Sequence, residues 1–256
     1  MSEAYAEFAG VYDRLMDNIP YDEWADYLFS LLREYGVDSG IVAELGCGTG
    51  NITERLSDLG YDMIGIDNSE EMLDVANEKK ANSGHEILYL CQDMREFELY
   101  GTVAAVVSIC DSINYVTDID ELTQVFSLVD NYLDPDGIFI FDFNTRHYYK
   151  DIVADATIAE DREDISFIWD NFFDEETDIN ELALSLFVRE KEEKDLYRKY
   201  EELHLQRGYE LCDIKQAIER SGLKYVADFD AFTHEAANED SQRIYVIARE
   251  SGRKSI

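Results

Sequence analysis

The chain has 256 residues and a formal net charge of −35, because 57 acidic residues outnumber 22 basic ones. Hydrophobic residues make up 46% of it, enough for one large domain or a domain with a sizeable insertion. An acidic surface disfavours nucleic acid and anionic membranes as partners, and is compatible with a highly soluble cytoplasmic protein, a saline host or a cationic substrate.

The N-terminal part of the chain reads as two helices, residues 3–17 and 21–35, joined at residues 18–20. Apolar side chains recur every three to four residues on one face of each helix, so both should pack on the rest of the domain. Tyr12 and Tyr21 could either pack there or turn their phenols towards a ligand. We expect a cytoplasmic protein, because no basic stretch precedes an apolar core at the start and no apolar run approaches the roughly 20 residues of a membrane span.

The next segment, residues 41–51, reads I-V-A-E-L-G-C-G-T-G-N and predicts a buried parallel strand, a tight turn and the start of a helix. Glycines permit a positive φ and let a ligand approach the backbone, which the first free N–H groups of the helix then face. The dinucleotide fingerprint G-x-G-x-x-G is excluded, because its third glycine would fall at Asn51. A phosphate loop of the NTPase kind is excluded as well, because no Lys-Ser or Lys-Thr follows.

Strands and helices then alternate as far as residue 143, which predicts a doubly wound α/β fold with a parallel sheet and helices on both faces. Ser69 and Asp118 are the expected N-caps of two of these helices. We predict helices at residues 52–59, 69–82 and 118–133, strands at residues 61–66, 86–91, 102–109 and 138–143, and a turn at residues 134–137.

The pattern changes after Asn144. Three aromatic and β-branched strands, with acidic turns between them at 174–178 and 191–195, predict an antiparallel meander at residues 165–173, 182–190 and 196–209. A helix at 210–221, ended by Gly222, and strands at 223–229 and 242–249 should complete the edge of the main sheet. We therefore divide the chain into a Rossmann-like domain, residues 1–144 and 208–256, and an antiparallel β insertion, residues 145–207, which we expect to act as a substrate lid.

The four cysteines, at positions 47, 91, 110 and 212, are scattered and show neither C-x-x-C spacing nor partner histidines. We therefore predict no metal site, and expect the cysteines to serve as small apolar packing residues in a reducing compartment. The sequence does not indicate an oligomeric state.

The E-x-G-x-G-x-G sequence at residues 44–50 resembles motif I of the class I S-adenosylmethionine-dependent methyltransferases. Over its whole length the chain is similar to the YqeM-type bacterial methyltransferases, through Y-D-E-W at 21–24, C-D-S-x-N-Y at 110–115 and H-x-Q-R-x-Y at 204–209. The resemblance implies a seven-stranded, mostly parallel Rossmann-like sheet, S-adenosylmethionine as cofactor, and in-line transfer of its methyl group to a nitrogen, oxygen or carbon atom. The alternative for the motif itself is a glycine-rich turn that binds no ligand.

Acidic residues at strand ends are the next candidates for cofactor binding. Asp67 should lie beside the glycine turn and accept hydrogen bonds from both ribose hydroxyls, and the resemblance implies that Asp93 takes the adenine amine. Glu44 could approach the cofactor ammonium through water or be purely structural. The residues that we expect to bind the cofactor are Tyr12, Tyr21, Glu44, Gly46, Cys47, Gly48, Asn51, Asp67, Asn68, Met72, Asp93, Met94, Cys110 and Asp111.

Three residues are candidates for the acceptor side: His204, Arg207 and Tyr115. Arg207 could hold a substrate carboxylate with two hydrogen bonds, or form a structural ion pair, and His204 or Tyr115 could remove a proton. We expect a small-molecule acceptor, because the charge disfavours nucleic acid and the insertion can cover a closed pocket. The alternatives are methyl transfer to RNA or protein, and a non-catalytic module that only binds the cofactor.

Overall fold

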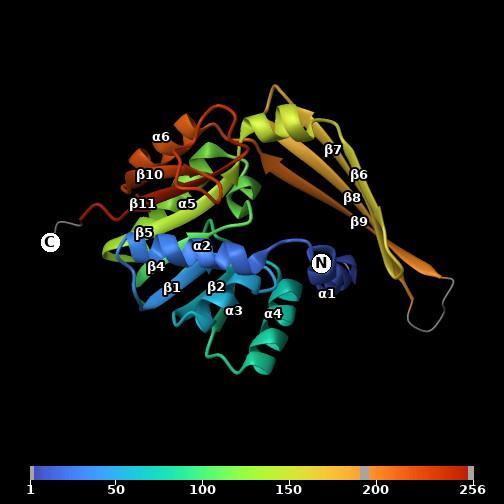
Figure 1. Cartoon of the computed structure of the whole chain (residues 1–256), viewed down its shortest axis with the longest axis horizontal. Helices are drawn as coiled ribbons and strands as arrows, with labels where there is room; N and C mark the ends of the chain where they lie inside the picture. Colours follow the sequence, from blue (N-terminus) through green and yellow to red (C-terminus); the bar gives the residue numbers. More distant parts are fainter. Residues whose placement is uncertain (1–2, 191–195, 253–256) are drawn as a thin grey trace.

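The computed structural model describes residues 3–190 and 196–252, and for residues 3–8 the backbone alone. A seven-stranded sheet has the order β10-β11-β5-β4-β1-β2-β3 (Figure 1). Its first five strands in the chain are parallel, and β11 runs antiparallel between β5 and β10. The predicted doubly wound, mostly parallel sheet is thus confirmed. The strands are β1 (Ile41–Leu45), β2 (Asp62–Asp67), β3 (Leu88–Cys91), β4 (Val103–Ser108), β5 (Leu133–Asn144), β10 (Lys224–Asp230) and β11 (Arg243–Arg249).

Helices cover both faces of this sheet, as the nearly continuous burial along β1, β4 and β11 requires. In β5, Ile138 and Ile140 belong to the apolar cluster with α2 (Tyr21–Glu34) and α3 (Asn51–Asp58). Phe139, Phe141 and Phe143 belong to the opposite cluster, with α5 (Ile119–Tyr132) and α6 (Leu211–Ser221). In residues 3–190 and 196–252, none of the helices combines the length and the apolar character of a membrane crossing.

Local capping accounts for several helix boundaries. Ser69 Oγ accepts a hydrogen bond from Met72 N at the start of α4 (Glu70–Ser83), and Asp118 accepts from two N–H groups at the start of α5. Gly222 ends α6 in the left-handed conformation. These three predictions are confirmed.

The turn predicted at residues 134–137 is wrong as a boundary, because β5 already begins at Leu133. Leu133 pairs with Val103 of β4, and the register shifts before Ile138 pairs with Ala105. Asp136 has a φ of 66°, so the turn residues form an irregularity within a paired strand.

The 3-10 turn η1 (Ser112–Tyr115) lies between β4 and α5, and the π-helical turn η2 (Tyr148–Val153) follows β5. A separate four-stranded sheet comes after η2. It is antiparallel throughout, but it has one strand more than the three predicted. The additional strand, β6, has every residue exposed and so lacks the apolar alternation that reveals a strand. The four strands are β6 (Thr157–Asp161), β7 (Ile165–Asp174), β8 (Ile179–Arg189) and β9 (Tyr197–Arg207), and the turn predicted at 191–195 lies outside the described residues.

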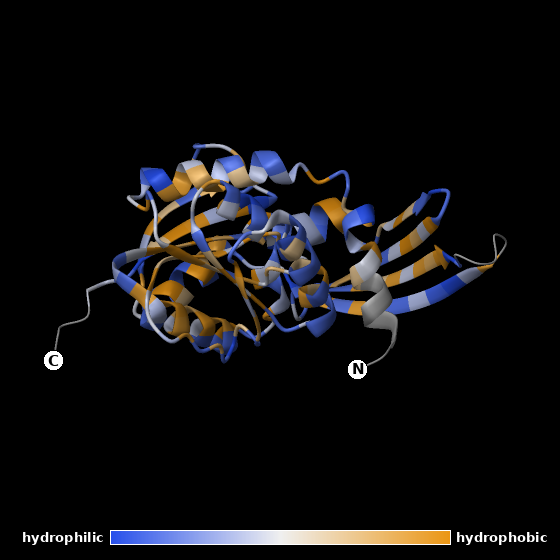
Figure 2. Ribbon diagram, turned by 90° about the horizontal axis from the view of Figure 1, so that it is seen from below, coloured by the Kyte–Doolittle hydropathy of each residue, from blue (hydrophilic) through white to orange (hydrophobic). Residues whose placement is uncertain are grey.

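The second sheet extends away from the main sheet beside α1 (Glu3–Leu15), and apolar and polar segments alternate along its strands (Figures 1 and 2). Val11 and Leu15 of α1 pack in one apolar cluster with Leu184, Leu186 and Tyr200 of the sheet. The inner face of the second sheet therefore closes on α1, at the end of the molecule where the parallel strands finish.

Candidate active site

The glycine turn and the end of β2 form a polar cradle. Gly48 N donates to Asp67 Oδ2 at 2.8 Å and Ser69 N donates to Asp67 Oδ1 at 2.9 Å, which fixes the carboxylate at the start of α4. Burial raises the pKa of Asp67, although these backbone hydrogen bonds act in the opposite direction. A Cβ built on Gly48 would meet no atom within 4 Å, so the turn opens onto free space beside the carboxylate. An acceptor of hydroxyl groups next to an open glycine turn fits the predicted cofactor.

The two flanking glycines are also required by packing. Gly46 and Gly50 have φ values of 70° and 76°, in the left-handed region. A Cβ on Gly50 would collide with the hydroxyl of Tyr89, and one on Gly46 would collide with Ser112. Between them, Cys47 is buried, and burial raises the pKa of its thiol.

Helix α1 is fastened to the glycine turn by Asp13. Its Oδ1 accepts hydrogen bonds from Thr49 Oγ1 at 2.7 Å and Asn51 Nδ2 at 2.8 Å, and its Oδ2 lies 2.7 Å from Lys79 Nζ of α4. Burial alone would raise the pKa of Asp13, but hydrogen bonds from these three side chains outweigh that effect and lower it. The side-chain amide of Asn51 takes part in these contacts, and its role as a cofactor ligand remains a prediction. Neither Asp13 nor Lys79 was predicted, because no local pattern marks a contact between residues so far apart in the chain.

Two phenols from the N-terminal helices reach the end of β4. Burial raises the pKa of Tyr21 to about 12, and the nearby Cys110 thiol adds to the rise while hydrogen bonds with Tyr12 and Asn51 oppose it. Burial likewise raises the pKa of Tyr12, which faces Tyr21, Cys110 and Asp111. The structure therefore brings these predicted residues together above the glycine turn.

The remaining predicted cofactor residues occupy different surroundings. Glu44 is buried and accepts a hydrogen bond from Thr53, and burial raises its pKa to about 8. Met94 reaches the space above Gly46, whereas Met72 packs against the apolar cluster between α1 and the second sheet. Asn68 is exposed.

Asp93 already has a partner in the protein. Its Oδ2 lies 2.6 Å from Arg95 Nη2, and its Oδ1 accepts a hydrogen bond from Arg95 N at 2.8 Å. The hydrogen bond from the Arg95 side chain lowers the pKa of Asp93 and keeps it ionised. Its contact with adenine remains a prediction.

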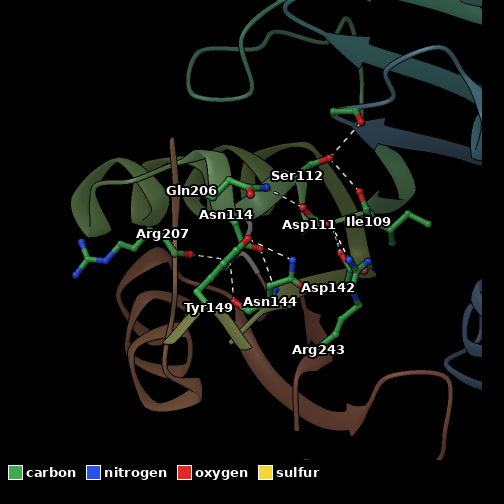
Figure 3. A network of polar contacts seen from close by, with 11 residues as sticks. Ile109, Asp111, Ser112, Asn114, Asp142, Asn144, Tyr149, Gln206, Arg207 and Arg243 are labelled. Atoms are coloured by element: carbon green, nitrogen blue, oxygen red, sulfur yellow. Dashed lines mark hydrogen bonds and ion pairs between the residues drawn. The ribbon is translucent and has the colours of Figure 1, made fainter. Parts of the chain in front are cut away.

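An ion network joins the ends of four strands (Figure 3). Asp111 Oδ1 lies 2.6 Å from Arg243 Nη2, and its Oδ2 accepts a hydrogen bond from Gln206 Nε2 at 2.8 Å. Arg243 also lies 2.8 Å from the fully buried Asp142, whose other oxygen accepts a hydrogen bond from Asp111 N. Burial raises the pKa of Asp142, and the Arg243 charge opposes that rise. Cys110 and Asp111 have φ values of 60° and 54°, a strained pair that this network holds in place.

Asn114 connects the main sheet to the second sheet (Figure 3). Its Nδ2 donates to Asn144 O at 2.8 Å and to Arg207 O at 2.7 Å, and its Oδ1 accepts from Asn144 N. A hollow of about 340 Å³ lies at this end of the molecule and is lined by Asn144, Tyr148, Phe232 and Arg243, among others. Hollows of this volume are in the range of small-molecule sites.

The three residues predicted for the acceptor side separate into two groups. The Arg207 guanidinium points away from the ion network, donates to Thr117 O at 3.0 Å and lies over the Tyr209 ring (Figure 3). Tyr115 Oη and His204 Nδ1 are 3.3 Å apart, so these two residues do meet. In the described part of the chain, no three His, Cys, Asp or Glu side chains are arranged to hold a metal ion.

Comparisons with known proteins agree with this geometry. Residues 42–137 match the family model described as a methyltransferase domain. The protein named "Putative methyltransferase YqeM" from Bacillus subtilis (strain 168) is 36% identical over 250 residues, which is 96% of this chain and 97% of that protein. A crystal structure of an S-adenosylmethionine-dependent methyltransferase from Clostridium acetobutylicum ATCC 824 superposes with a TM-score of 0.86 at 27% identity, covering 97% of this chain and 99% of the other.

The fold also extends to more distant enzymes. S-adenosylmethionine-bound CalS10 from Micromonospora echinaspora, an amino pentose methyltransferase, superposes with a TM-score of 0.74 at 14% identity, covering 94% of this chain and 97% of CalS10. At that identity the likeness concerns the fold alone. The full-length similarity to YqeM is what establishes the family, and with it S-adenosylmethionine as the cofactor. This chain belongs to the YqeM family of S-adenosylmethionine-dependent methyltransferases.

Proposed function

We propose that this methyltransferase modifies a small-molecule acceptor held between α1, the second sheet and the ends of β4 and β5. The observation that carries the proposal is the apolar cluster through which Val11 and Leu15 of α1 pack on the second sheet. Because this packing covers the site, it favours an acceptor that is small enough to be enclosed, rather than a long polymer. Residues 145–207 would then act as the lid of the acceptor site. Membership of the family makes the chain an enzyme, which removes the alternative of a module that only binds the cofactor.

The cofactor would lie across the glycine turn. We assign its ribose hydroxyls to Asp67, its adenine to Asp93 and Met94, and the surroundings of its methionine end to Tyr12, Tyr21 and Cys110. When bound, S-adenosylmethionine supplies a methyl group already activated by a positively charged sulfur. The protein's own task is then to place the acceptor atom against that methyl group and to exclude water.

Charge favours a cationic or neutral acceptor over a phosphate polymer. Three basic side chains around the site already have acidic partners. Arg243 pairs with Asp111 and Asp142. Lys79 pairs with Asp13, and Arg95 pairs with Asp93. An RNA substrate would need Lys or Arg side chains along an open groove that are not already in ion pairs with acids. CalS10, which shares the fold, is named for an amino pentose, and an amino sugar is an acceptor of the proposed kind.

Two measurements test the proposal in sequence. Calorimetry should show binding of S-adenosylmethionine and of S-adenosylhomocysteine, and binding of neither would overturn the cofactor sites. The loaded enzyme is then incubated with amino sugars, other small amines and small hydroxyl compounds, and in parallel with total RNA and a protein extract. We expect a mass gain of one methylene in a small molecule. Methyl incorporation confined to RNA or protein would refute the proposed acceptor class.

A further inference from the structure

Glu202 extends the pair of Tyr115 and His204 into an array of three residues. It lies on β9 two residues before His204, so both side chains project from the inner face of the second sheet. His204 Nε2 lies 3.0 Å from Glu202 Oε2, and His204 Nδ1 lies 3.3 Å from Tyr115 Oη. The Tyr115 and His204 rings meet edge to face, with centroids 5.9 Å apart. The order is therefore phenol, imidazole, carboxylate.

Burial decreases along this array from Glu202 to Tyr115. The side chain of Glu202 is 4% exposed, that of His204 is 15% exposed, and Tyr115 at the outer end is 48% exposed. The carboxylate is thus buried on the inner face of the second sheet, while Tyr115 is accessible at the surface. This is the arrangement expected of a proton acceptor supported from behind by a buried charge.

One atom of Glu202 has no explanation in the fold. Its Oε1 is buried and has no hydrogen-bond partner among the described residues, a costly condition for a carboxylate. Its neighbours across the sheet are Leu184 and Trp169, and an apolar side chain would suit that position better. We therefore infer that the Glu202 carboxylate serves a purpose other than stability, and the group that it contacts is His204.

We propose that Glu202 is a positioning residue that holds the Nε2–H tautomer of His204, so that Nδ1 can take the Tyr115 proton while the phenol oxygen takes a proton from the acceptor. The inference rests on the proposed function and narrows it. An acceptor that needs this relay carries a proton on its nucleophilic atom, as a protonated amine or a hydroxyl compound does. A thioether, whose sulfur carries no proton, would gain nothing from it.

The step balances without a further reagent. An N–H or O–H bond of the acceptor breaks, and its proton passes to Tyr115 Oη as the phenolic proton passes to His204 Nδ1. The electron pair left on the acceptor atom forms the bond to the methyl carbon, while the carbon–sulfur bond breaks and its electron pair returns to sulfur. The imidazolium formed at His204 is stabilised by Glu202 until the proton leaves to solvent.

The spectroscopic test is nitrogen-15 NMR of the imidazole rings in the full chain bound to S-adenosylhomocysteine. The chain has four histidines, and a His204→Gln variant assigns the signals of interest. We expect the Nε2–H tautomer of His204 in the wild type and a mixture of tautomers in Glu202→Leu. Asp58→Asn is the matched control, because Asp58 lies 3.1 Å from Nε2 of His85, away from this array, and it should leave the His204 signals unchanged. A wild-type proton on Nδ1, or an unchanged tautomer in Glu202→Leu, would overturn the inference.

The kinetic test uses an acceptor found in the panel above. Tyr115→Phe and His204→Gln should lower kcat by about 10² to 10⁴, the usual contribution of acid–base catalysis. Glu202→Gln should lower kcat at least about tenfold with little change in KM for the cofactor. If cofactor binding and methyl transfer are both present but Glu202→Gln and Glu202→Leu retain wild-type kcat, the relay is refuted while the proposed function stands. If no cofactor binds, the proposed function fails instead.

Discussion

Asp67→Asn is the substitution that tests the cofactor site most directly. The asparagine keeps the size of the side chain and one carbonyl oxygen, which can still accept the hydrogen bond from Gly48 N. Its amide nitrogen would then face Ser69 N, where two donors meet and neither has an acceptor. The charge that should receive the ribose hydroxyls is lost as well.

The size of the effect follows from these contacts. A hydrogen bond to a charged group contributes about 1.5 to 3 kcal/mol, and the carboxylate is expected to receive two from the ribose. The remaining amide oxygen can still accept one weaker hydrogen bond, so the net loss should be about 2 to 4 kcal/mol. At 1.4 kcal/mol for each factor of ten, affinity for S-adenosylmethionine should fall about 30- to 700-fold.

The assay is isothermal titration calorimetry with S-adenosylmethionine, on samples whose circular dichroism and melting temperature match those of the wild type. Asp62→Asn is the matched control, because Asp62 is an exposed aspartate at the opposite end of the same strand, β2. It should bind the cofactor as tightly as the wild type does. A folded Asp67→Asn protein that binds within about twofold of the wild type would refute the ribose assignment.

Three other predictions concern Gly50, Arg243 and the protonation of Asp67. Gly50→Ala should destabilise the fold by about 2 to 4 kcal/mol in urea unfolding, because a positive φ and a collision with Tyr89 add together; a loss below about 0.5 kcal/mol would contradict this. Arg243→Lys should cost about 1.5 to 3 kcal/mol, because the compact ammonium keeps the charge but loses one of the two contacts that the guanidinium makes with Asp111 and Asp142; an unchanged melting temperature would count against it. Burial raises the pKa of Asp67, so the protonated carboxyl group stabilises the cofactor-free folded state at acid pH. Cofactor binding, in contrast, needs the ionised carboxylate. Affinity should therefore fall as pH drops through that raised pKa and stay level above it, and a level profile throughout would be inconsistent with the assignment.

The parts of the fold predicted correctly from sequence are those that depend on local physics. Ser69 caps α4 through a hydrogen bond to Met72, three residues away, and the residue types alone indicate such a contact. The strand at residues 41–45 and its glycine turn are likewise local, because burial and positive φ both restrict residue type at single positions. The order of the elements and the parallel sheet follow from their alternation.

The parts that could not be predicted depend on contacts across the chain. Asp13 meets Thr49 across 36 residues, and Asp111 meets Arg243 across 132. In a chain with 57 acids, no pattern shows which acid each base will choose. Arg207 illustrates the limit, since its place in H-x-Q-R-x-Y suggested a substrate carboxylate or a structural ion pair, but gave no sign that its guanidinium donates to the carbonyl of Thr117. Its contact with a substrate carboxylate remains a prediction.

Helix α1 is the element that relates the cofactor side to the acceptor side. Asp13 ties it to the glycine turn, while Val11 and Leu15 on the same helix pack on the second sheet. Arg162, between β6 and β7, adds a salt bridge of 3.0 Å to Asp17 just beyond the end of α1. A ligand that orders the glycine turn therefore also orders one wall of the acceptor space, because the same helix contacts both. Cofactor binding should consequently favour acceptor binding, and by linkage the acceptor should tighten the cofactor by the same factor.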